Sequence, residues 1–157
     1  SVDLFQVGGT IASDCGIQNV QELATNNAIK YNNHGHNVKI IRGNSHSQQT
    51  LDQVKDFLPS GIDLLFIDGD HNYDAVVKDF NLYYPLVNRG GFIVFDDYLP
   101  YVWNGKSRTC PSAVNHLVQQ HRHELNVYGL IDDVAGCHQY KMIDPQKNTT
   151  FIVQRVP

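Results

Sequence analysis

The stretch IDLLFIDGDHNYDAVVKDFNLYYPLVNRGGFIVFDDY, residues Ile62–Tyr98, decides the fold. It opens on a nearly continuous apolar run, Ile62–Ile67, which is typical of a β-strand covered on both faces. The apolar residues that follow recur at helical spacing and predict a helix over Tyr73–Leu86. Arg89–Gly91 then predicts a turn into a second buried strand, Phe92–Phe95. Two strands joined through a helix are expected to be parallel neighbours in one sheet.

The sequence on either side continues the alternation of strands and helices. The further elements that it predicts are strands at Val2–Val7, Val38–Arg42, Asn126–Ile131 and Thr150–Val156, and helices at Val20–Tyr31, before Phe57 and at Ser112–His123. This alternation favours an α/β layered fold built on a parallel sheet. We expect one domain over residues 1–157.

The composition excludes several classes of protein. The 157 residues are 41% hydrophobic, which is enough to bury a core and excludes a disordered chain. The net charge is −4 with no block of Lys and Arg, which argues against nucleic acid as a partner. No apolar run approaches the roughly 20 residues that span a bilayer, so we expect no membrane segment. Three widely spaced cysteines favour a reducing, cytoplasmic setting.

Polar residues follow three of the predicted strands, at Gly43–Ser45, Asp68–His71 and Asp96–Asp97. In an open parallel sheet, ligands bind beyond the carboxyl ends of the strands. Carboxylates crowded at one edge resist joint ionisation unless a cation compensates them. Oxygen ligands favour Mg²⁺, Mn²⁺ or Ca²⁺ over zinc. In the alternative interpretation, Asp68 and Asp96 only cap the turns that follow their strands.

The order of these motifs resembles strands four and five of class I S-adenosylmethionine-dependent methyltransferases. It is similar to the metal-dependent sugar and small-molecule O-methyltransferases related to macrocin O-methyltransferase. In those enzymes an apolar strand, D-G-D or D-G-x-H, a helix, a Gly-Gly turn and a strand ending in D-D-Y follow one another. The upstream segment NAIKYNNHGHNVKIIRGNS looks like the helix and third strand of that fold, so that the resemblance covers about Val2–Gln119. It implies a three-layer, Rossmann-like sheet, mainly parallel with one antiparallel strand.

The resemblance also implies how a metal-assisted reaction would use these residues. Asp68, Asp96 and Asp97 match the ligands of a divalent ion, Mg²⁺ or else Mn²⁺ or Ca²⁺, that holds neighbouring acceptor hydroxyls and lowers the pKa of the one attacked. His71 matches the general base three residues beyond the first ligand, a role that suits an imidazole at neutral pH. Asp70 is the alternative base. A purely structural alternative for His71 is a hydrogen bond to backbone at the start of the helix.

The cofactor S-adenosylmethionine has further matches in the family pattern. Asp3 matches the acidic residue that binds the ribose hydroxyls, although it lies early in its strand, and Asn44 and Ser45 match the turn that faces adenine. Asp68 and Asp70 are expected to line the cofactor site as well. For the acceptor, Trp103 matches the substrate-side loop, and packing in the core is the alternative for this side chain.

One departure from the family pattern concerns the glycine-rich loop after strand one. The sequence contains no good copy, and QVGGT at Gln6–Thr10 is at most a degraded version. Val2–Val7 is therefore better interpreted as strand two, with strand one upstream. We expect an N-terminally truncated domain, or half of a site that an upstream domain or a homo-oligomer completes.

Three functions compete at this point. The leading hypothesis is a metal-assisted, S-adenosylmethionine-dependent O-methyltransferase that acts on a sugar, a glycan or another small molecule with vicinal hydroxyls. The first alternative is a non-catalytic methyltransferase-like scaffold or partner module, which the missing glycine loop favours. The second is a metal-dependent glycosyltransferase that uses Asp68-x-Asp70, although only 67 residues precede Asp68, fewer than its nucleotide-binding sheet needs.

Overall fold

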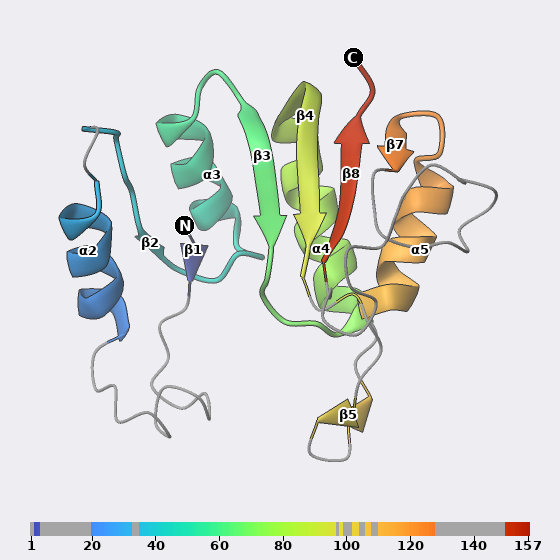
Figure 1. Ribbon diagram of the computed structural model, residues 1–157, viewed down its shortest axis with the longest axis horizontal. Coiled ribbons are helices and arrows are strands. Elements are labelled where there is room, and N and C mark those ends of the chain that lie inside the picture. Colours follow the sequence, from blue (N-terminus) through green and yellow to red (C-terminus); the bar gives the residue numbers. More distant parts are fainter. Residues whose placement is uncertain are drawn as a thin grey trace. The chain divides into compact units, whose positions relative to one another are not determined.

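The computed structural model describes residues 2–3, 20–32, 35–96, 98, 102–103, 106–107, 110–127 and 150–157. The chain divides into two compact units, Ser1–Phe57 and Leu58–Pro157, shown in Figure 1. The expectation of one domain over 1–157 stays a prediction. Among the described helices, none is both long enough and apolar enough to cross a membrane.

The first unit contains a short parallel sheet and two helices. Strand β1 (Val2–Asp3) pairs in parallel with β2 (Ile41–Arg42), helix α2 (Val20–Lys30) lies between them in sequence, and α3 (Gln48–Phe57) follows. The prediction of a strand over Val38–Arg42 is wrong at its start. Among the described residues, the pairing of β2 with β1 begins where Ile41 faces Val2, so the strand starts at Ile41.

The second unit is built on a four-stranded mixed sheet. In sheet order its strands are β3 (Ile62–Ile67), β4 (Val87–Phe95), β8 (Phe151–Arg155) and β7 (Leu125–Val127). The pairing of β3 with β4 is parallel, which confirms the prediction that these strands are parallel neighbours. Strand β8 runs antiparallel to both β4 and β7, so it is the single antiparallel member of this sheet. The predicted end of β7 at Ile131 lies outside the described residues.

The helices of this unit agree closely with the prediction. Helix α4 (Tyr73–Tyr83) continues as the 3₁₀ helix η1 (Tyr84–Leu86), because Pro85 has no N–H with which to extend the α-helical ladder. Helix α5 (Cys110–Gln120) begins two residues earlier than expected, and the short strands β5 (Val102–Trp103) and β6 (Lys106–Ser107) pair before it.

The predicted turn at Arg89–Gly91 is instead a bulge inside β4. Ile62 pairs with Val87 and Leu64 with Phe92, so two steps along β3 match five along β4. The extra residues include Gly90, whose φ of 80° lies in the left-handed region that glycine tolerates best. The strand therefore begins at Val87 and continues through the two glycines, which form part of the bulge.

The core of the second unit lies between the sheet and helices α4 and α5. Its largest fully buried side chains come from both helices and from β4 and β8; they are Phe80, Phe95, Phe151, Ile93, Leu117, Val76, Val87, Val114 and Val153. Because side chains alternate along a strand, the β3 residues that face away from this core are Leu64 and Phe66. They are 62% and 52% exposed.

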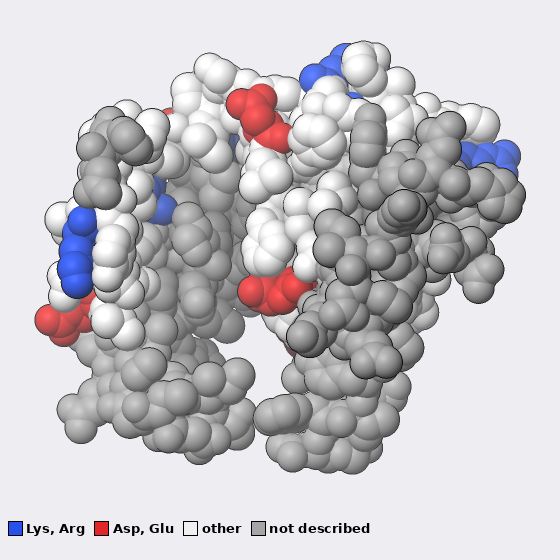
Figure 2. Space-filling model, viewed as in Figure 1, with Lys and Arg blue, Asp and Glu red and all other residues white. Residues whose placement is uncertain are grey.

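The exposure of Leu64 and Phe66 contradicts the prediction that Ile62–Ile67 is covered on both faces. The physical reason is that the two described α-helices of this unit, α4 and α5, both contribute to the core on the other face of the sheet. In Figure 2 the surface over β3 is uncharged between acidic groups near the two ends of the strand.

Candidate functional site

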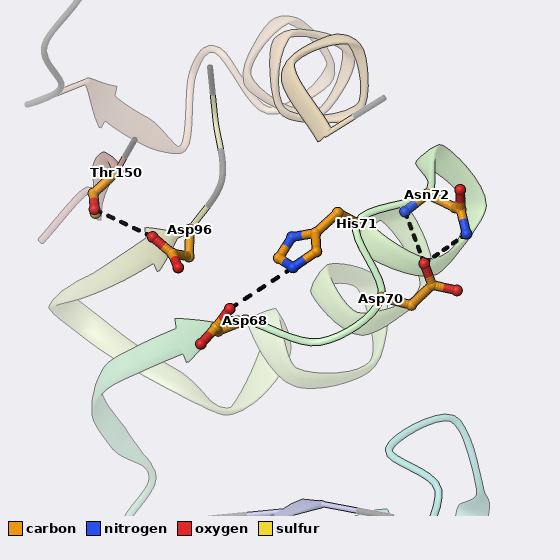
Figure 3. Close-up of polar contacts among 6 residues, drawn as sticks. All are labelled: Asp68, Asp70, His71, Asn72, Asp96 and Thr150. Atoms are coloured by element: carbon orange, nitrogen blue, oxygen red, sulfur yellow. Dashed lines mark hydrogen bonds and ion pairs between the residues drawn. The ribbon is translucent and has the colours of Figure 1, made fainter. Parts of the chain in front are cut away.

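The carboxylates of Asp68 and Asp96 lie at one edge of the four-stranded sheet. Each follows the last residue of its strand, and these last residues, Ile67 and Phe95, are paired. The backbone N–H of Asp96 donates to the carbonyl oxygen of Ile67 at 3.0 Å, which extends the pairing by one residue. Asp68 is half-exposed and Asp96 is partly buried. The parallel pairing thus places two carboxylates from distant parts of the sequence side by side, as Figure 3 shows.

His71 faces this edge from the segment between β3 and α4. Its Nε2 lies 3.8 Å from Oδ1 of Asp68, and its side chain is only 14% exposed. Figure 3 shows the imidazole directed toward Asp68 and Asp96. The arrangement therefore places a ring nitrogen of His71 close to the Asp68 carboxylate, at the sheet edge where Asp96 also lies.

Asp70 has a different place. Its Oδ1 accepts hydrogen bonds from the backbone N–H of Asn72 at 3.0 Å and from Asn72 Nδ2 at 2.6 Å. An Asp that accepts the N–H two residues ahead forms a local turn, and here the turn leads into α4. In Figure 3 the Asp70 carboxylate points away from Asp68 and Asp96. Of the two predicted bases, His71 is therefore the one that faces the paired carboxylates.

Thr150 contacts the site, although sequence analysis gave it no role there. Its hydroxyl donates to Oδ1 of Asp96 at 3.4 Å, across 54 residues of sequence (Figure 3). The contact depends on β8 returning beside β4, and no local pattern around Thr150 indicates that pairing.

Tyr98 anchors the segment that follows β4. Its hydroxyl donates to Oδ1 of Asn115 in α5 at 3.0 Å, and its ring stacks on Phe151 with centroids 4.7 Å apart. Asp96 and Tyr98 are thus both fixed against other elements. Asp97, the residue between them, lies outside the described residues.

A buried acidic residue, Asp79, lies beneath the segment that carries Asp68 and His71. It belongs to α4, and its Oδ2 is 3.4 Å from the position that a Cβ on Gly69 would take. Burial raises the pKa of Tyr83 to about 12, and the negative charge of Asp79 adds to that rise. The burial of Asp79 was also not predicted from the sequence. The signal that could have indicated it is the position of an acidic residue between the core residues Val76 and Phe80.

The chemistry of these side chains fits a hard divalent cation. Asp68 and Asp96 offer oxygen donors at one strand edge, the ligand type that Mg²⁺ prefers. Within the described ranges, no group of three His, Cys, Asp or Glu side chains could hold a metal ion. Because Asp97 is not among those residues, the predicted set of three carboxylates stays a prediction.

The predicted adenine turn belongs to the first unit. Asn44 Oδ1 accepts the backbone N–H of His46 at 2.9 Å, and the Ser47 hydroxyl accepts the N–H of Thr50 at 3.1 Å. A Cβ on Gly43 would meet the Thr50 hydroxyl at 2.5 Å, so glycine is required where the chain turns into α3. These contacts fix the turn around Ser45.

Two further predicted site residues are described by backbone alone. Asp3 lies in β1 and Trp103 in β5. Their side chains lie outside the described part of the chain, so their roles stay predictions.

Known proteins resemble this chain in sequence and in structure. The sequence model of a family described as a methyltransferase domain matches residues 1–98. An uncharacterised protein of Acanthamoeba polyphaga mimivirus is 37% identical over 137 residues, which cover 87% of this chain and 57% of the relative. The structure of the O-methyltransferase NovP aligns with a TM-score of 0.57 and 19% identity, over 99% of this chain and 59% of that chain.

These comparisons bear on the fold and on the extent of the chain. The structural similarity to NovP confirms the predicted Rossmann-like sheet with one antiparallel strand. The chain spans somewhat more than half the length of the two relatives, 57% of one and 59% of the other.

Proposed function

This chain belongs to the methyltransferase domain family, and we propose that the protein containing it is an S-adenosylmethionine-dependent O-methyltransferase assisted by a divalent metal. The proposed acceptor is a sugar, a glycan or another small molecule with neighbouring hydroxyls. One observation carries the proposal: Asp68 and Asp96 follow paired residues of adjacent parallel strands, and His71 faces Asp68 from the same edge.

The proposed metal ligands are Asp68 and Asp96, with Asp97 as the third. Two carboxylates held by the backbone pairing of β3 and β4 need little rearrangement to share one cation. A bound Mg²⁺, or Mn²⁺ or Ca²⁺ in its place, would lower the pKa of an acceptor hydroxyl. The negative charges of the carboxylates would also attract the cation to this edge.

His71 is the proposed general base. A hydroxyl becomes a better nucleophile as its proton is removed, and Nε2 of His71 is directed to the edge where we place the acceptor. Oδ1 of Asp68, 3.8 Å from Nε2, would stabilise the imidazolium that forms. Asp70 is less suited, because its Oδ1 already accepts two hydrogen bonds from Asn72.

The proposed cofactor contacts divide by chemical group. In the first unit, Asp3 would bind the ribose hydroxyls, and Asn44 and Ser45 would face adenine. In the second unit, Asp68 and Asp70 are the proposed cofactor contacts. Because Asn44 Oδ1 accepts the His46 N–H, we assign the adenine contact of Asn44 to its Nδ2 donors. Trp103 is the proposed contact to the acceptor.

The alternatives differ in what they would bind. The family match and the local turn formed by Asp70 favour a methyltransferase over a glycosyltransferase that uses Asp68-x-Asp70. A scaffold or partner module would keep the fold and bind no S-adenosylmethionine.

Two measurements on the complete protein separate these functions: calorimetry of ligand binding and an assay of methyl transfer. We expect S-adenosylhomocysteine to bind, and methyl transfer from S-adenosylmethionine to a vicinal diol or sugar to require Mg²⁺ and to stop in EDTA. Failure of S-adenosylhomocysteine to bind with or without Mg²⁺ would favour the scaffold. Binding of a nucleotide sugar in its place would favour the glycosyltransferase, and full transfer in EDTA would rule out the metal.

A further inference from the structure

Asp96 is held by a residue that comes from a distant part of the chain. The Thr150 hydroxyl donates to Asp96 Oδ1 at 3.4 Å, and both side chains are partly buried. Figure 3 shows this contact on the side of Asp96 away from His71. The proposed ligand Asp96, which follows β4, thus has a hydrogen-bond partner contributed from just before β8.

The register of the sheet explains why Thr150 lies at this place. Phe95 pairs with Phe151 in the antiparallel ladder, so Asp96, which follows β4, and Thr150, which precedes β8, face one another. The ladder is fixed by side chains that are fully buried in the core, Phe151 and Val153 among them. A slip of one residue would turn these side chains away from the core, so the position of Thr150 is strongly specified.

A hydrogen bond to one carboxylate oxygen restricts how the whole carboxylate can rotate. With Oδ1 of Asp96 directed to Thr150, the second oxygen, Oδ2, is left on the side of Asp68, as Figure 3 shows. Groups that hydrogen-bond to a metal-binding carboxylate orient it and raise its affinity for the ion.

We propose that Thr150 is a positioning residue that sets the orientation of the Asp96 carboxylate for a divalent cation. The proposal rests on the proposed function, in which Asp96 is a metal ligand. It also places one determinant of the site beyond residues 1–98, the part that the methyltransferase family matches.

The test compares Thr150→Val, which keeps the shape and removes the hydroxyl, with Thr150→Ser, which keeps the hydroxyl. Calorimetric titration of the complete protein with MgCl₂, without acceptor, should show a dissociation constant about tenfold higher for Thr150→Val. Thr150→Ser should bind Mg²⁺ nearly as the unmodified protein does. The affinity for S-adenosylhomocysteine in EDTA and the midpoint of thermal unfolding should be the same in all three proteins.

Thr25→Val, an exposed substitution in α2, is the matched control and should leave Mg²⁺ binding unchanged. If the unmodified protein binds Mg²⁺ and Thr150→Val binds it equally well, the positioning role is wrong while the proposed function stands. Equal loss of affinity and of thermal stability in Thr150→Val and Thr150→Ser would show a packing role instead. Absence of Mg²⁺ binding in the unmodified protein would overturn the metal-assisted function and this inference with it.

Discussion

The imidazole Nε2 of His71 lies 3.8 Å from Oδ1 of Asp68, three residues earlier, at the edge of the sheet where Asp96 also lies. The distance is longer than a hydrogen bond, so the ring lies beside the carboxylate rather than bonded to its Oδ1. His71 is therefore positioned to face the site. Asp70, one residue before it, is directed away.

Replacing His71 by Ala should lower kcat by about 10²–10⁴-fold, because the acceptor hydroxyl loses its proton acceptor. Binding of S-adenosylhomocysteine should change little. Added imidazole should restore part of the lost rate in His71→Ala, since a free base can enter the space left by the ring. Steady-state kinetics with saturating Mg²⁺ measure both effects. A normal kcat in His71→Ala together with a large loss in Asp70→Asn would assign the base to Asp70.

Replacing Asp96 by Asn should weaken Mg²⁺ binding by at least about tenfold while the protein stays folded, because an amide is a poorer ligand than a carboxylate. Titration with MgCl₂ and the midpoint of thermal unfolding test the two parts. Asp63→Asn is a suitable control, since Asp63 lies near the opposite end of β3 and contacts Asn88. Equal Mg²⁺ affinity in Asp96→Asn and Asp63→Asn would contradict the metal role of Asp96.

The strand–helix–strand core of the fold could be predicted from the sequence because its signals are local. The apolar run Ile62–Ile67 lies within β3, which has the predicted bounds, and the helical spacing over Tyr73–Leu86 corresponds to α4 and the 3₁₀ helix η1 that continues it. The bulge in β4 could not be predicted, because Arg89–Gly91 has the composition of a turn. Only the pairing of Leu64 with Phe92 shows that the strand continues through it.

Contacts between distant segments explain the other differences. A strand can have the same apolar composition whether one or both of its faces are covered, so the exposure of Leu64 and Phe66 could not be predicted from the sequence. Thr150 is part of the site only because β8 pairs with β4. The turn formed by Asp70 and Asn72 does not depend on distant segments, because its hydrogen bonds are local. An Asp two residues before the N-cap of a helix is a pattern from which this turn could have been predicted.

The stability of the second unit should fall at both extremes of pH through Tyr84 and Glu124. The Tyr84 hydroxyl donates to Glu124 Oε2 at 2.6 Å. Burial, followed by this hydrogen bond, raises the pKa of Tyr84 to about 12, while the hydrogen bond from Tyr84 lowers the pKa of Glu124. The contribution of Tyr84 to the free energy of unfolding is complete below its ordinary pKa of 10.0 and is lost as the pH rises from there toward 12.

The effect of pH on stability has the opposite sign for Glu124. Its contribution to the free energy of unfolding is present above its ordinary pKa of 4.5 and is lost as the pH falls through the lowered folded-state pKa. Denaturant unfolding as a function of pH should therefore show less loss of stability above pH 10 in Tyr84→Phe than in the unmodified protein. Glu124→Gln should likewise flatten the acid side of the profile. Unchanged profiles in both variants would show that the pair does not couple folding to pH.

Gly61 and Gly90 form a matched pair for testing backbone strain, because both have a positive φ, 89° and 80°. A Cβ on Gly90 would meet no atom within 4 Å, whereas one on Gly61 would overlap the Asn88 side chain and lie 3.0 Å from the Leu86 carbonyl oxygen. Gly90→Ala should therefore lower the free energy of unfolding by about 1–2 kcal/mol, the cost of holding an alanine in the left-handed conformation. Gly61→Ala should cost about 1–3 kcal/mol more, because overpacking is added where the chain enters β3. Urea denaturation measures both values, and an equal loss for Gly61→Ala and Gly90→Ala would mean that Asn88 moves aside without cost.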